Sequence, residues 1–103
     1  MDVATVATAM LNAAKDSAGE TWPQIQHDFA SDLGAVLRNA AKIETQLAAG
    51  DLTQDEAKDL LEDQSNTLFM LTAEVEQASK IAAQNAINAA IDALWQAVRA
   101  AIP

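Results

Sequence analysis

The sequence predicts an all-α protein, and three features of its 103 residues support this fold class. Alanine, leucine, glutamine and charged residues, all with high helix propensity, dominate the composition. Apolar residues recur every three or four positions, which is the spacing of one face of a helix. With only 3 glycines and 2 prolines, the chain has few turn-forming residues for a sheet. We expect a single helical domain over residues 1–103.

The first predicted helix covers about residues 3–17. Its apolar stripe contains Val3, Val6 or Ala7, Met10 and Ala14. The segment Gly19–Pro23 then predicts a break, because glycine accepts the backbone conformation that ends a helix and proline fits the first turn of the next one. The alternative is one long helix with a sharp kink near Pro23.

Two longer helices follow, over about residues 23–49 and 54–102. The stripe of the earlier one contains Trp22, Ile25, Phe29, Leu33, Val36, Ala40, Ile43 and Leu47. Gly50 ends this helix. Thr53 and Glu56 have the spacing of a capping box, which marks the start of the later helix. No glycine or proline follows until Pro103, so we expect the later helix to be continuous.

Chain reversal at Gly50-Asp51 predicts a long helical hairpin whose first arm is broken near Gly19–Pro23. This arrangement places Leu33 near Leu68. It also places the first helix beside the alanine-rich segment Ala86–Ala101, where two backbones can approach closely. Gln64 lies on the apolar seam, where a polar residue commonly fixes the register of helix packing.

A single hairpin leaves large apolar residues uncovered. Consecutive apolar residues near the middle of the last helix occupy most of its circumference, whereas one partner helix covers one face. We therefore expect an antiparallel four-helix-type bundle formed by a homodimer. The predicted subunit interface is Leu60, Leu61, Leu68, Phe69, Met70 and Leu71. The alternative is a compact three-helix monomer whose last helix breaks near Gln84-Asn85.

The charge of the chain is strongly acidic, with 15 acidic and 6 basic residues and a net charge of −9. This charge argues against nucleic acid as a partner. Much of the acidity lies in residues 51–76, and the acidic tip of the hairpin is a candidate docking surface for a basic protein. The tip comprises Asp55, Asp59, Glu62 and Asp63. Calcium binding is not expected, because Glu56 stands where a calcium loop requires glycine.

The sequence offers little for catalysis or for a cofactor. It has no cysteine, and its single histidine, His27, has no Glu-x-x-His motif around it. We expect no enzyme activity, no catalytic residues, no metal and no cofactor. Trp22 and Trp95 are interpreted as packing anchors.

Location and function complete the expectations. No run of about 18 apolar residues predicts a membrane span. The absence of cysteine and of a basic segment after Met1 favours a cytoplasmic protein. The leading hypothesis is a non-enzymatic scaffold or protein-interaction module that acts as a homo-oligomer. The alternatives are an acidic inhibitor or antitoxin-like protein that binds a basic partner, and a carrier of an apolar ligand in the bundle core.

Overall fold

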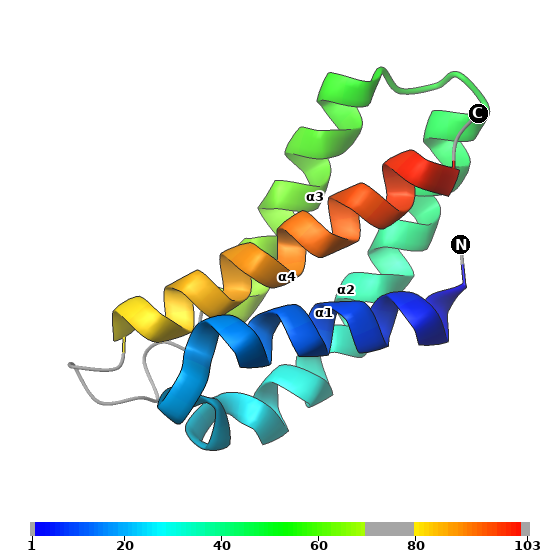
Figure 1. The fold of residues 1–103 in the computed structure, drawn as a ribbon. Helices are drawn as coiled ribbons and strands as arrows, with labels where there is room; N and C mark the ends of the chain where they lie inside the picture. The colour runs from blue at the N-terminus through cyan, green and yellow to red at the C-terminus, as the bar shows by residue number, and fades with distance from the viewer. Residues whose placement is uncertain (1, 70–79, 102–103) are drawn as a thin grey trace.

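Two layers of α-helices make up the fold (Figure 1). The computed structural model describes residues 2–69 and 80–101, and these contain helices and no strand, so the all-α prediction is confirmed for them. The helices are α1 (Val3–Ala18), α2 (Trp22–Ala48), α3 (Gln54–Phe69) and α4 (Lys80–Ala101). α1 packs chiefly on α4 in one layer, and α2 packs on α3 in the other.

The junction between α1 and α2 is a sharp kink without a connecting loop. A 3₁₀ turn, η1 (Gly19–Thr21), links the two helices directly, and the chain changes direction there (Figure 1). Gly19 has φ 55°, a conformation that glycine adopts without strain. Pro23 lies in the first turn of α2, where its missing N–H breaks no hydrogen bond. Of the two alternatives at this junction, the kink is therefore correct.

The predicted apolar stripe of α2 is buried along its whole length. The helix ends in a Schellman motif, in which the Asp51 N–H donates to the Gln46 carbonyl at 2.9 Å and the Gly50 N–H donates to the Leu47 carbonyl at 3.2 Å. Gly50 has φ 82°, as this motif requires. The end of the helix thus lies where the sequence placed it.

The pairing of α2 with α3 follows the predicted register. Asn39 Nδ2 donates to Gln64 Oε1 at 2.9 Å, and these two residues lie nearly equally far before and after the turn at Gly50-Asp51. α1 packs on α4, which contains Ala86–Ala101, again as expected. The order of neighbours along the chain was therefore read correctly from the sequence.

The prediction of one continuous helix over 54–102 is wrong. α3 and α4 are separate helices that pack against each other, which two parts of one straight helix cannot do. A helix of that length would measure about 70 Å, whereas the longest dimension of the molecule is 43 Å. The long hairpin is therefore wrong as well. The alternative break at Gln84-Asn85 is also wrong, because both residues lie inside α4.

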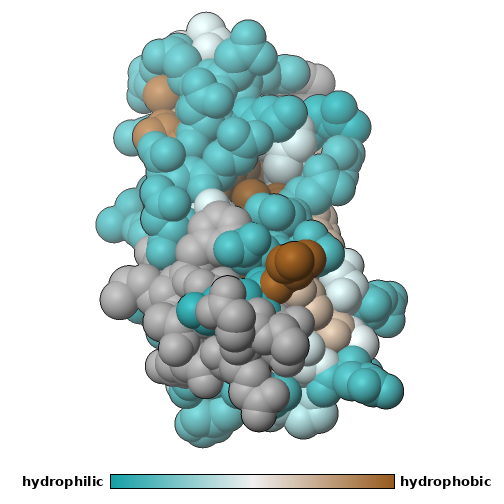
Figure 2. Space-filling model, turned by 90° about the vertical axis from the view of Figure 1, so that its left-hand side faces the viewer, coloured by the Kyte–Doolittle hydropathy of each residue, from teal (hydrophilic) through white to brown (hydrophobic). Residues whose placement is uncertain are grey.

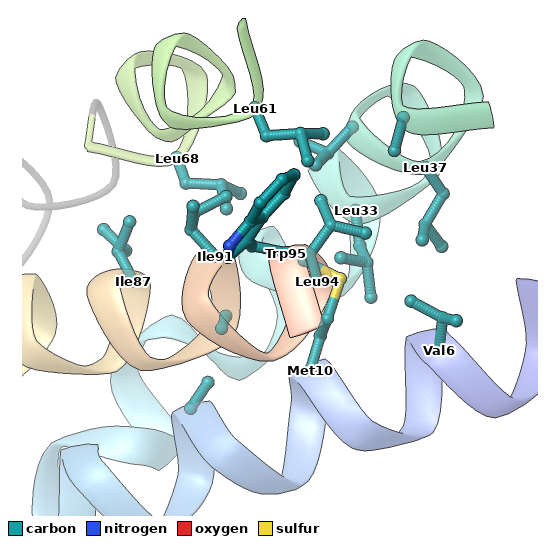
Figure 3. Packing of buried hydrophobic residues seen from close by; sticks show 14 of the residues in the cluster. Val6, Met10, Leu33, Leu37, Leu61, Leu68, Ile87, Ile91, Leu94 and Trp95 are labelled. Carbon is teal, nitrogen blue, oxygen red and sulfur yellow. The ribbon is translucent and has the colours of Figure 1, made fainter. Parts of the chain in front are cut away.

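This reversal closes the core within one chain. Side chains from all four helices point toward a common centre (Figure 3). The largest fully buried side chains are Phe29, Met10, Ile25, Leu61, Leu68, Ile87, Leu94, Val36 and Val98. Burying this apolar surface stabilises the fold more than continuing a helix by propensity alone would.

Candidate interaction surface

The outward side of α3 is an acidic face. Its carboxylates are Asp55, Glu56, Asp59, Glu62 and Asp63, and all five side chains are exposed. Ala57, Leu61 and Leu68, on the opposite side of the helix, are fully buried. At about 100° per residue, the carboxylates span roughly a third of the helix circumference. The four residues of the predicted acidic tip therefore lie together on one exposed surface.

The start of α3 holds Glu56 in place. The Thr53 N–H donates to Glu56 Oε1 at 3.0 Å, and the Glu56 N–H donates to Thr53 Oγ1 at 3.1 Å. This is the predicted capping box. The backbone hydrogen bond from Thr53, followed by the bond with its side chain, lowers the pKa of Glu56 below its ordinary value. Glu56 thus remains ionised at neutral pH and is oriented by the backbone.

A groove of about 390 Å³ lies between α3 and α4, next to the acidic face. Its apolar floor is formed by Leu61, Ile91 and Trp95, which are buried. Its exposed rim is formed by Lys58, Glu62, Asn88 and Asp92. Glu62 belongs to both the acidic face and the rim, so the two surfaces are continuous.

Two buried polar groups in this groove lack a hydrogen-bond partner among the described residues. Ser65 is only 9% exposed and Trp95 only 8% exposed, and both line the groove. The Ser65 hydroxyl and the Trp95 indole N–H form no hydrogen bond within residues 2–69 and 80–101. Buried hydroxyl and indole N–H groups normally find a partner. Both can therefore bind a polar group that enters the groove.

The predicted subunit interface has a mixed outcome. Leu61 and Leu68 are fully buried within one chain, so a second copy is not needed to cover them (Figure 3). Leu60 is 37% exposed. The side chain of Phe69 and the residues Met70 and Leu71 lie outside the described residues. The interface itself stays a prediction.

Other candidates from the sequence are packing or surface residues. Trp22 is buried and meets Phe29 edge-on, with 5.6 Å between the ring centroids, as expected for a packing anchor. His27 is exposed on α2. Within the described part of the chain, no group of three or more His, Asp or Glu side chains could hold a metal ion. In the same part, no helix is long and apolar enough to cross a membrane.

Sequence reasoning missed the groove because it treated α3 and α4 as one helix. Asn88, Asp92 and Trp95 recur at helical spacing, which places polar groups and an aromatic ring on one side of α4. This spacing was available as a signal, but only the reversal between the two helices brings that side against α3.

Comparisons with protein-family models, with curated proteins and with solved structures found no match to this chain. The hydrophilic surface in Figure 2 carries only small separate hydrophobic areas on the side shown. The charges of α3 and the groove beside it are thus the features on which a function can be argued.

Proposed function

We propose that this chain is a non-enzymatic protein-interaction module that binds a basic partner protein through the acidic face of α3. The observation that carries the proposal is that all five carboxylates of α3 are exposed, while Lys58 is the only basic residue of that helix. A surface of one sign attracts a partner of the opposite sign and accelerates their encounter. The proposed cytoplasmic location would give such a module access to basic intracellular proteins.

The architecture supports this proposal. The core is closed by the four helices of one chain, which leaves the outer side of α3 free for a partner. α3 is also held at both levels: its first turn by the Thr53–Glu56 capping box, and its side by the hydrogen bond between Asn39 and Gln64. A rigid element presents charges with little entropic cost on binding.

The test compares two variants with the same change in net charge. The first, Asp55→Asn with Asp59→Asn and Asp63→Asn, removes three charges from the acidic face. The control, Asp16→Asn with Glu20→Gln and Asp51→Asn, removes three exposed charges elsewhere. The probe is a synthetic peptide of repeated Lys-Leu-Ala-Arg units, and affinity is measured by isothermal titration calorimetry at several salt concentrations.

We expect the first variant to lose about tenfold in affinity, because each exposed ion pair contributes about 0.5 kcal/mol. The control should lose less than about threefold, and the affinity of the wild type should fall steeply as salt shortens the screening length. Equal losses in both variants, or an affinity that does not depend on salt, would refute the acidic face as the binding surface.

A homodimer is the second candidate. It is favoured by Ile81, which is 72% exposed in the first turn of α4, an unusual exposure for a large apolar side chain. A second subunit that covered this region would remove Ile81 from water. The acidic face itself is unsuited to a symmetric contact, because two copies would bring like charges together.

Light scattering of the wild type and of Ile81→Glu tests the dimer. We expect a mass near twice 10.9 kDa for the wild type and a lower mass for the variant. The control is Val3→Glu, which places the same charge on another exposed apolar residue. A wild-type mass of 10.9 kDa at every concentration would exclude the dimer. The third alternative, a carrier of an apolar ligand, stays a prediction, since it depends on Phe69 and Met70.

A further inference from the structure

We propose that the groove between α3 and α4 binds one lysine or arginine side chain of the basic partner, together with the peptide backbone next to it. This inference rests on the proposed function, because it assigns the point at which the partner is anchored. The acidic face would attract the partner, and the groove would recognise one position in it.

The two unpartnered polar groups indicate that a polar ligand enters the groove. The Ser65 hydroxyl and the Trp95 indole N–H are both nine-tenths buried, and neither has a hydrogen-bond partner among the described residues. An indole N–H can only donate, so the ligand must supply an acceptor. A peptide carbonyl next to the bound side chain has this property, whereas a simple alkyl cation does not.

The charges of the rim select a cation. Glu62 lies on α3 and Asp92 on α4, so the two carboxylates stand on different walls of the groove. A guanidinium or ammonium group can interact with both. Lys58 is one helical turn before Glu62 on the same rim and repels a second cation. The site therefore favours a single basic residue flanked by uncharged ones.

The size of the groove agrees with this occupant. Its volume of about 390 Å³ lies within the range of sites that hold small molecules, and its floor is apolar. The methylene stem of a basic side chain can pack on Leu61 and Ile91 while its charged end stays at the rim.

The experiment uses a short peptide with one arginine between leucine and alanine residues. The control peptide contains citrulline in place of arginine, which has nearly the same shape without the charge. Binding is followed by the fluorescence of Trp95 in a Trp22→Phe background, which keeps an aromatic ring against Phe29 and leaves one indole. We expect the arginine peptide to shift the emission of Trp95 and to bind at least about tenfold more tightly than the citrulline peptide.

Two matched variants locate the site. Glu62→Gln with Asp92→Asn removes both rim carboxylates, and Asp55→Asn with Asp63→Asn removes two charges of the acidic face outside the groove. We expect the groove variant to lose about tenfold or more in affinity and the other to lose less than about threefold. Ser65→Ala should lose about threefold while its helix content stays unchanged.

Specific outcomes would overturn the inference. Equal losses in the two charge variants would place binding on the acidic face and not in the groove. A free alkylguanidine that bound as tightly as the peptide would show that the peptide backbone is not recognised. If the repeated basic peptide binds and the single-arginine peptide does not, this inference fails while the proposed function stands. If neither peptide binds, both fail.

Discussion

Thr53 and Glu56 exchange two hydrogen bonds at the start of α3, and each satisfies a backbone N–H that the helix leaves without a partner. We expect Thr53→Ala to lower the free energy of unfolding by about 1 kcal/mol. The control is Thr8→Ala, which removes a hydroxyl that donates to the Ala4 carbonyl within α1 and should change stability by less than about 0.5 kcal/mol. Urea unfolding measures both, and equal effects would contradict this role of the cap.

The same cap predicts a pH dependence. Its hydrogen bonds lower the pKa of Glu56 in the folded chain, so the ionised form stabilises the fold above the unfolded pKa near 4.5. This contribution is lost as the pH falls through the lower, folded pKa. Acid also relieves repulsion within the acidic face, so the informative quantity is a difference. We expect the stability gap between wild type and Thr53→Ala to shrink as the pH falls from 7 to about 3. A gap that stays constant in urea titrations would contradict the assignment.

Residue-scale features differ in how well the sequence revealed them. The Thr53–Glu56 box was predicted because its spacing is diagnostic. The cap of α1 was not: Asp2 Oδ1 accepts the Ala4 N–H at 3.2 Å, and Asp2 Oδ2 accepts the Thr5 hydroxyl at 2.8 Å. Aspartate next to a helix start was the available signal.

At the scale of elements, glycine has opposite roles at two positions. Gly19 forms the kink between α1 and α2 with a positive φ, whereas Gly34 lies within α2, where an added Cβ would meet only Arg38 Nη1 at 3.6 Å. We expect Gly19→Ala to destabilise the protein by about 1–2 kcal/mol and Gly34→Ala to stabilise it by about 0.5–1 kcal/mol. Thermal unfolding of both variants measures the two shifts. Shifts of the same sign would contradict the backbone conformation of the kink.

The helices themselves were largely predictable, and one chain reversal was not. The stripes of α1 and α2 have clear periods, and Gly19 and Gly50 mark the ends of these helices. Between Thr53 and Pro103 the chain has no glycine or proline, so local propensity favours one helix throughout. The reversal that separates α3 from α4 is a tertiary effect. It lets Leu61 and Leu68 be buried by their own chain, which local rules do not evaluate.

At the scale of the whole molecule, the acidic half of the candidate site was predictable and the groove was not. Asp55, Asp59, Glu62 and Asp63 share one helix face, which periodicity alone shows. The groove combines Ser65 and Glu62 of α3 with Asp92 and Trp95 of α4, and these meet only once the two helices pack together. The same packing weakens the argument for an obligate dimer, because it covers much of the surface that a second subunit was expected to cover.

The central claim is that a single chain closes its own core by packing α4 against α1 and α3. Urea unfolding followed by circular dichroism, at protein concentrations that differ by about a hundredfold, tests this claim most directly. A core closed within one chain predicts the same helix content and the same unfolding midpoint at every concentration. A helix content and a midpoint that both fall on dilution would show that the core is shared between chains, and would contradict the account.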